Sequence, residues 1–267
     1  MARINIGGRS ITTDEIQDLL ATDHPMVQQF RFEQTRGYRS EALHFALHIV
    51  PRAGVRYLQQ RDAHGQRICS PVGRVGGADK PPAWNTLTGG ERIGQGNRAI
   101  WLEGDELVAE NCTFFPNQEF NDLGIGSALY VAMERFYRQL GIQRVTLLAV
   151  DVGVYVWARQ GFAFAESGLG GRVADLQRLV HQHDPAASID RGRFHESWDL
   201  ANYDHAGLVI DDYRVGKAFM LGHAPAWHGV RYLDEPLYVE TAEASRRETF
   251  SRLPAKIEGA PLGLAIR

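Results

Sequence analysis

Hydrophobic residues recur with the period of an α-helix between residues 125 and 140. Charged and polar side chains fall off this stripe, as expected of a helix that buries one face. Gly141 follows at the position where a left-handed residue commonly ends a helix. The pattern predicts an amphipathic helix whose buried stripe consists of Ile125, Leu129, Ala132, Met133, Phe136 and Leu140.

Apolar runs flank this predicted helix. One run ends in Phe114–Phe115–Pro116, and the other covers Arg144–Val150. The second run is nearly continuous, which is typical of a strand buried on both faces in a parallel arrangement. The segment therefore predicts a strand–helix–strand unit with parallel strands. A short helix over 151–160 and a further strand over 161–166 are expected next.

The turn before the helix contains two glycines, Gly124 and Gly126. The first amides of a helix have no partners within it, and glycines let the backbone approach a ligand closely. Such a turn is suited to binding an anion such as a phosphate group. A Gly-x-Gly sequence at a helix start is also ordinary turn chemistry, so both interpretations stay open on the turn alone.

This order of elements resembles the GNAT superfamily of acyl-CoA-dependent N-acyltransferases over about residues 101–166, with Gly-x-Gly at the first turn and Gly161–Phe162 after the second helix. The resemblance implies a mixed α/β fold (α+β, mixed sheet) of GNAT type. It also implies acetyl-CoA or another acyl-CoA as cosubstrate, with its pyrophosphate held by amides of the turn. The implied cofactor-binding residues are Phe114, Phe115, Asn121, Asp122, Leu123, Gly124, Ile125, Gly126, Ser127 and Trp157.

Two positions depart from the family pattern. Asn121 stands where the family's turn has Arg or Gln, which leaves a shorter polar side chain there. Trp157 stands where the family usually has a tyrosine, often proposed to protonate the departing thiolate. Tryptophan cannot supply that proton at neutral pH, so catalysis proceeds without the acid or another group provides it. Tyr155 is the nearest phenol and a candidate catalytic residue, although two residues rotate by about 200° along a helix.

Glu110 is the candidate general base. It interrupts an apolar stretch in the second strand of a predicted hairpin, whose strands cover 99–102 and 106–115 and turn at 103–105. A carboxylate in such a strand suits the removal of a proton from an ammonium group. Some GNAT enzymes resemble this arrangement, with a glutamate base on the strand before the pyrophosphate turn. The alternative is a solvent-facing glutamate on the outer side of that strand.

The N-terminal part predicts a strand at Arg3–Ile6 and a helix that begins with the capping box Thr12-x-x-Glu15. A second helix is expected over Ser40–Val50, ended by Pro51. His44 and His48 have the spacing of a metal-binding pair on that helix, but no Glu or Cys ligand pattern adjoins them. No metal is therefore expected.

Glycine and proline accumulate between about residues 70 and 97 and predict a long loop, either a lid over an acceptor site or an insertion without a role. Its stretch Gly89–Gly96 lacks the Lys-Ser/Thr ending of a P-loop, which disfavours nucleotide hydrolysis.

We expect a GNAT-like domain over 1–170 and a C-terminal extension over 171–267 packed on it. The extension predicts a helix over Arg172–His183 and an aromatic-rich stretch over 227–232 that belongs to the core or to an acceptor pocket. The extension also contains a run of acidic residues, Asp199, Asp204, Asp211 and Asp212. These carboxylates either receive a cationic amine or are solvated surface groups.

Composition narrows the function classes. The chain has 267 residues and a formal net charge of −3, which gives no electrostatic case for nucleic acid or an anionic membrane surface. Its two cysteines, Cys69 and Cys112, are too few for a disulfide framework and fit a reducing compartment. No apolar run has the length of a membrane span, and the N-terminus lacks a signal peptide's apolar core, so a cytoplasmic location is expected.

The expected function is acyl transfer from acyl-CoA to an amine acceptor by direct attack, with Glu110 or a water molecule taking the proton. Two alternatives stay open: a catalytically inactive GNAT-like module that binds coenzyme A or a protein, and a different enzyme that uses the same anion site. The acceptor, a small molecule or a protein, is not identified by the sequence, and an oligomer also stays open.

Overall fold

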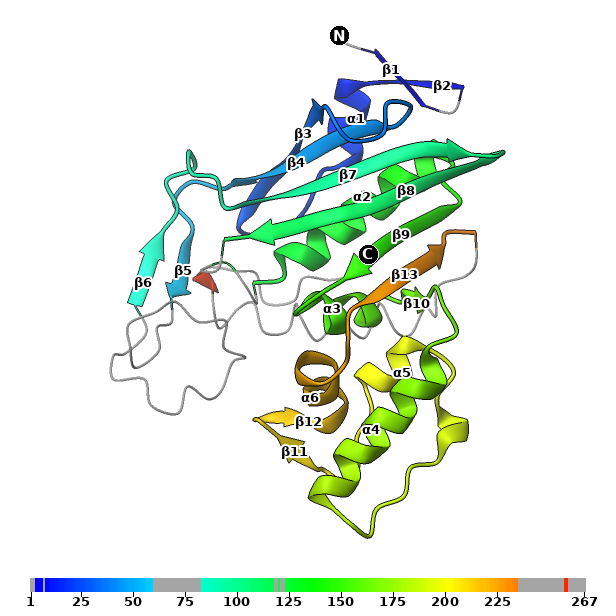
Figure 1. Cartoon of the computed structure of the whole chain (residues 1–267). Helices are drawn as coiled ribbons and strands as arrows, with labels where there is room; N and C mark the ends of the chain where they lie inside the picture. Colours follow the sequence, from blue (N-terminus) through cyan, green and yellow to red (C-terminus); the bar gives the residue numbers. More distant parts are fainter. Residues whose placement is uncertain are drawn as a thin grey trace. The chain divides into compact units, whose positions relative to one another are not determined.

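The structure is a computed structural model that describes residues 3–6, 8–59, 83–117, 120, 123–234 and 257–258. The chain is mixed α/β, as predicted (Figure 1). It divides into two compact units, residues 1–143 with 246–267 and residues 144–245.

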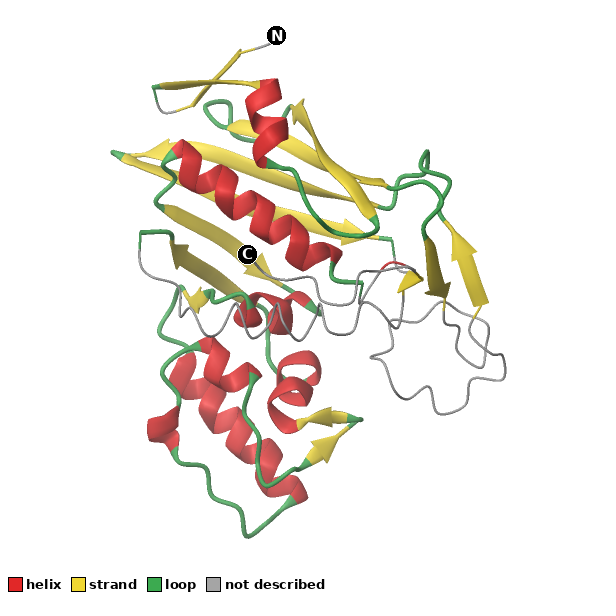
Figure 2. Ribbon diagram, turned by 180° about the vertical axis from the view of Figure 1, so that it is seen from behind, coloured by secondary structure: helices red, strands yellow, loops and turns green. Residues whose placement is uncertain are grey.

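The first unit is built on antiparallel strands in the order β3–β4–β7–β8. Helices α1 (Thr13–Leu19) and α2 (Ile125–Leu140) lie on the same face of these strands, as Figure 2 shows. Phe45 of β4 meets Phe136 of α2 edge-on, with ring centroids 5.9 Å apart. The strands are Val27–Thr35 (β3), Leu43–Pro51 (β4), Gly94–Glu103 (β7) and Glu106–Pro116 (β8).

Both helices of this unit match their sequence signals. Thr12 and Glu15 form the reciprocal capping box at the start of α1. Helix α2 covers the predicted range and ends at Gly141, whose φ is 72°. The predicted hairpin of β7 and β8 is confirmed as well, with its turn between Glu103 and Glu106.

Shorter strands complete the first unit. The predicted first strand, β1 (Arg3–Ile6), pairs with β2 (Arg9–Thr12). A small sheet has the order β14–β5–β6. The predicted long loop is strand at β6 and again from Gly94, while residues 60–82 lie outside the described part. The strands of the small sheet are Arg56–Gln59 (β5), Ala83–Thr86 (β6) and Ile257–Glu258 (β14).

The helix predicted over Ser40–Val50 is wrong, because this segment is strand β4. The strand lies between β3 and β7 and is buried on both faces, so its sequence is apolar almost throughout. A short apolar run of this kind fits a helical period as well as a strand. Residues four apart in a strand are separated by about 13 Å, so His44 and His48 do not have the spacing of a shared metal site.

The second unit contains strands in the order β10–β13–β9, all antiparallel. These are β9 (Arg144–Ala149), β10 (Ala163–Phe164) and β13 (Trp227–Tyr232), so the aromatic-rich stretch is a strand and its Trp227 is buried. Burial alternates along β9 and Leu148 is half exposed, so the expected burial on both faces is wrong. Strands β8 and β9 belong to different units, and their parallel pairing stays a prediction.

Helices of the second unit pack on one another next to these strands. Strand β13, from the expected extension, pairs with β9 and β10 of the expected first domain. The chain passes from the first unit to the second between residues 143 and 144 and returns between 245 and 246, whereas the expected boundary lay near 170. Among the described residues, no helix has the length and apolar character needed to cross a membrane. The remaining elements are α3 (Gly153–Arg159), α4 (Leu169–His183), η2 (Arg191–Arg193), α5 (Ser197–Ala201), β11 (Val209–Ile210), β12 (Tyr213–Arg214) and α6 (Val215–Gly222).

Candidate functional site

Strand β8 contains a β-bulge just after the candidate base. Arg98 of β7 is paired with Asn111 and its neighbour Asn97 with Thr113, which leaves Cys112 as the extra residue on β8. A bulge bends its strand, re-aims side chains and interrupts the ladder of backbone hydrogen bonds. The pairing of β8 with β7 is thus interrupted between Glu110 and the residues that lead to the turn before α2.

A buried arginine holds this bulge together. The Arg98 guanidinium is 3% exposed and donates from Nη1 to the carbonyls of Asn97, at 2.7 Å, and Thr113, at 2.6 Å. Burial lowers the pKa of Arg98, and within the described part of the chain no carboxylate pairs with it. On the same face Tyr137 of α2 donates to the Asn111 side chain at 2.9 Å. The bulge is therefore anchored from the helix side of the sheet.

Glu110 lies on the opposite, outer face of β8. It alternates with Asn111, which contacts α2, and its side chain is half-buried. The hydroxyl of Tyr38 donates to Glu110 Oε2 at 2.5 Å, and this hydrogen bond is the main reason why the pKa of Tyr38 is raised. Tyr38 is 69% exposed. Glu110 thus occupies the outer side of the strand, with a phenol as its partner.

Aromatic and cationic side chains surround this pair. The Arg39 guanidinium lies 4.1 Å from the centre of the Trp101 ring and 5.7 Å from that of Tyr38. The partly buried thiol of Cys112 is near Glu110 and Arg39, and burial, followed by the charge of Glu110, raises its pKa. No sequence pattern pointed to Tyr38 or Arg39, because they belong to a segment far from β8 in the chain.

The turn before α2 is held by a buried histidine that sequence reasoning missed. His24 Nε2 lies 2.7 Å from the carbonyl oxygen of Leu123, and its Nδ1 accepts from the Met26 amide at 3.2 Å. These partners require a neutral ring with hydrogen on Nε2. Burial lowers the pKa of His24 to about 4, which keeps the ring neutral at physiological pH. The carbonyl of Leu123 is thereby fixed directly before Gly124.

The two glycines of the turn have different roles. Gly124 has a φ of 73°, a conformation that favours glycine, and it caps α2 without a side chain. A Cβ at Gly126 would lie 3.1 Å from the Phe114 ring, so this glycine accommodates an aromatic side chain of β8. The first turn of α2, which includes Ile125 and Ser127, contains no acidic residue. Asn121, Asp122 and the side chain of Phe115 lie outside the described residues.

Tyr155 and Trp157 belong to the second unit. Trp157 packs edge-on against Phe162, with ring centroids 5.3 Å apart. Tyr155 instead lies near Lys217 of α6, whose ammonium is 5.3 Å from the ring centre. The two side chains of α3 therefore contact different parts of the second unit, as their separation along the helix predicts.

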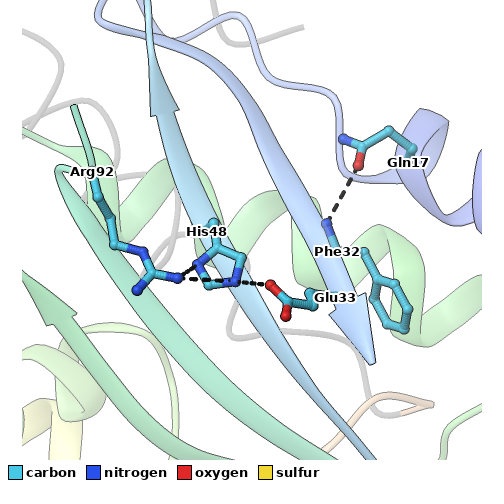
Figure 3. A network of polar contacts seen from close by, with 5 residues as sticks. All are labelled: Gln17, Phe32, Glu33, His48 and Arg92. Atoms are coloured by element: carbon cyan, nitrogen blue, oxygen red, sulfur yellow. Dashed lines mark hydrogen bonds and ion pairs between the residues drawn. The ribbon is translucent and has the colours of Figure 1, made fainter. Parts of the chain in front are cut away.

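A polar row on the outer face of the first unit includes His48 (Figure 3). His48 Nε2 lies 2.6 Å from Glu33 Oε2, and the Arg92 guanidinium contacts the other ring nitrogen. Because arginine can only donate, that nitrogen offers a lone pair to Arg92 and Nε2 donates to Glu33. Both nitrogens are thus engaged, and the described residues contain no cluster of groups suited to a metal.

The acidic run of the second unit has local structural roles. Asp199 accepts hydrogen bonds from the amides of His195, at 2.7 Å, and Glu196, at 3.0 Å, before α5. Asp211 and Asp212 both have positive φ, 50° and 66°, in the two-residue turn between β11 and β12. Asp199 therefore serves as a helix cap, and Asp211 and Asp212 serve as turn residues.

Neither a known family model nor a curated protein matches this chain.

Proposed function

We propose that the chain is an acyl-CoA-dependent N-acyltransferase of GNAT type that acylates an amine acceptor. The observation that carries the proposal is the arrangement along β8 and α2. Glu110 lies on the outer face of β8, and Phe114 of the same strand packs on Gly126 in the first turn of α2. Strand β8 therefore carries the candidate base, Glu110, and four residues later an aromatic ring that packs on the candidate anion-binding turn.

The turn supports acyl-CoA as cosubstrate. The positive end of the helix dipole attracts anions, and the first turn of α2 carries no carboxylate that would oppose one. His24 fixes the Leu123 carbonyl and thereby the start of the turn. In the proposal, backbone amides around Gly124–Ser127 hold the pyrophosphate of acetyl-CoA or another acyl-CoA, and no metal takes part.

The proposed chemistry is direct transfer. Glu110 takes a proton from the ammonium group of the acceptor, and the free amine attacks the thioester carbonyl. A carbon–nitrogen bond forms, the carbon–sulfur bond breaks, and the departing coenzyme A thiolate takes up, directly or through solvent, the second proton that the attacking nitrogen loses. Holding both reactants together supplies much of the rate enhancement, so a strong acid for the thiolate is not required.

Ligand-induced stabilisation tests the cosubstrate without knowledge of the acceptor. Acetyl-CoA at 100 times its Kd is expected to stabilise the folded chain by about 2.7 kcal/mol, visible as a raised Tm. Ser127→Glu places a carboxylate in the first turn, where it repels phosphate but favours the helix, so the gain is expected to vanish while the unliganded Tm holds.

The matched control is Gln139→Glu, which adds the same charge about 18 Å away along α2 and should leave the acetyl-CoA gain intact. Equal gains in both variants would remove the turn from cofactor binding. A folded wild-type chain that no acyl-CoA stabilises would refute the proposal.

Trp157 favours a second candidate, a module that binds acyl-CoA without turnover. The residue stands where the family pattern has a tyrosine, and its ring packs against Phe162. This candidate predicts the same stabilisation by acetyl-CoA but no release of free thiol with any amine. Thiol release in the presence of an amine panel decides between the two.

A further inference from the structure

Arg39 covers an aromatic ring on the outer face of the first unit. Its guanidinium stacks on Trp101 at 4.1 Å, and Trp101 is only 8% exposed. Helices α1 and α2 cover one face of the strands (Figures 1 and 2), and the register of β7 and β8 places Trp101 with Glu110 on the other face. Arg39 thus lies over an indole ring that also belongs to a buried apolar cluster with Ala99 and Val108.

The strand register brings the candidate base next to this ring. Trp101 is paired with Val108, and Ala99 is paired with Glu110. Trp101 and Glu110 are therefore diagonal neighbours on one face, about 7–8 Å apart at the backbone and within reach of long side chains. Tyr38 lies beside these two residues. Its hydroxyl donates a hydrogen bond to Glu110, and the centre of its ring lies 5.7 Å from the Arg39 guanidinium.

Indole, phenol and carboxylate are the groups with which proteins bind organic cations. Arg39 meets the two rings, and its charge also interacts with the side chains of Tyr38 and Glu41, but within the described part of the chain it forms no salt bridge. A single stacking contact of this kind is a weak interaction compared with a buried ion pair. Another cation can therefore replace Arg39 at small cost.

We propose that Arg39 is an internal occupant of a cation-binding subsite formed by Trp101, Tyr38 and Glu110, and that a ligand cation binds there by displacing it. The inference deepens the proposed acyl transfer and rests on it for the role of the ligand, which is the acceptor amine in its charged form. The ammonium then lies on the Trp101 face beside the carboxylate that takes its proton. Arg39 thus sets the affinity for acceptors.

Calorimetric titration of the full chain without acyl-CoA tests the subsite. The probes are N-acetyllysinamide, N-acetylargininamide and the neutral N-acetylnorleucinamide, which separate ammonium, guanidinium and apolar binding. Arg39→Gln is expected to bind at least one of the two cations about tenfold more tightly than the wild-type chain, without a gain for the neutral probe. Arg39→Lys keeps a cation in place and should behave like wild type.

The matched control is Arg56→Gln, which removes an arginine that stacks on Trp84, 5.4 Å from the ring centre, in the separate small sheet. It should not change the affinity for any probe. Adding Trp101→Leu or Glu110→Gln to Arg39→Gln should abolish the gain. Arg39→Met keeps an apolar stem over the ring and must show the same gain in affinity for the cationic probe as Arg39→Gln. The Tm of each variant shows whether it is folded.

Two results overturn the proposal: unchanged affinity for both cations in folded Arg39→Gln and Arg39→Met, or an equal gain for the neutral probe. The first would make Arg39 a structural tie, and the second would indicate an exposed apolar patch. Because the titrations contain no acyl-CoA, their outcome is independent of whether acetyl-CoA stabilises the chain. Failure of one proposal is thus distinguished from failure of the other.

Discussion

The surroundings of Glu110 are polar and aromatic side chains at the surface of the sheet, not a buried apolar core. Its carboxylate lies on the outer strand face and accepts a hydrogen bond from an exposed tyrosine, whose ring in turn contacts Arg39. A base in this position can be reached by an acceptor without rearrangement of the core. The sequence pointed to the residue but favoured its burial and its solvent exposure equally, and the alternation with Asn111 places it on the outer side.

At this scale we predict that Glu110→Gln lowers the rate of acyl transfer by about 10²–10⁴-fold, because the amide cannot take the acceptor's proton. The stabilisation by acetyl-CoA should stay unchanged, since the turn is a separate part of the first unit. Steady-state rates with Glu110→Gln across a range of pH provide the measurement. Wild-type turnover at every pH would exclude Glu110 as the base.

At the scale of elements, sequence reasoning succeeded where local signals were complete. The capping box of α1, the apolar stripe of α2 and its terminal Gly141 all specify structure through neighbours in the chain. It failed for β4, whose central position in the sheet gives an apolar sequence without a clear alternation. The bulge in β8 was also missed, because its cause is a partner on another strand, Arg98.

The bulge gives a prediction about Arg98. Arg98→Met removes the donor for the carbonyls of Asn97 and Thr113, and an unsatisfied buried carbonyl costs about 1–3 kcal/mol. We expect the free energy of unfolding to fall by roughly 2 kcal/mol or more, measured by denaturant titration.

The control for this prediction is Arg31→Met, which changes an exposed arginine of β3 and should alter stability little. If Arg98→Met were as stable as wild type, the guanidinium would not hold the bulge. Glu110 and Phe114 lie on either side of the bulge, so the variant is also expected to lose activity.

At the scale of the whole molecule, the expected domain boundary near residue 170 differs from the observed division. The second unit closes its strands with β13, which lies more than sixty residues beyond β10 in the chain. Pairing at this separation leaves no local pattern in the sequence: β9 and β10 were predicted as strands, whereas β13 was recognised only as an aromatic-rich stretch. Long-range pairing, as for β13, and the contacts of Arg39 and His24 were therefore beyond sequence reasoning.

Stability as a function of pH tests the buried His24. Its folded pKa of about 4 lies below the ordinary value of 6.5, so the unfolded chain binds a proton that the folded chain does not. The stability that depends on a neutral His24 is fully present above pH 6.5. It is lost as the pH falls from 6.5 through 4, by about 3 kcal/mol in total. Nearby Arg52 also disfavours the charged ring.

His24→Gln retains one donor and one acceptor without a titrating group, so the variant should show a smaller loss of stability between pH 6.5 and 4. Unfolding free energies from urea titrations at several pH values are the measurement, with the exposed His228→Gln as control. Parallel curves for His24→Gln and wild type would show that the ring titrates normally in the folded chain.

The contact between Phe114 and Gly126 has a consequence for how this protein can evolve. The ring fills the space that a Cβ at position 126 would occupy, with 3.1 Å between them, so the two positions share one volume. A larger residue at 126 is tolerated only after the ring at 114 becomes smaller, and the order of the two changes matters. Mutational paths through this turn are therefore narrow, since the same segment joins the candidate base to the candidate cosubstrate site.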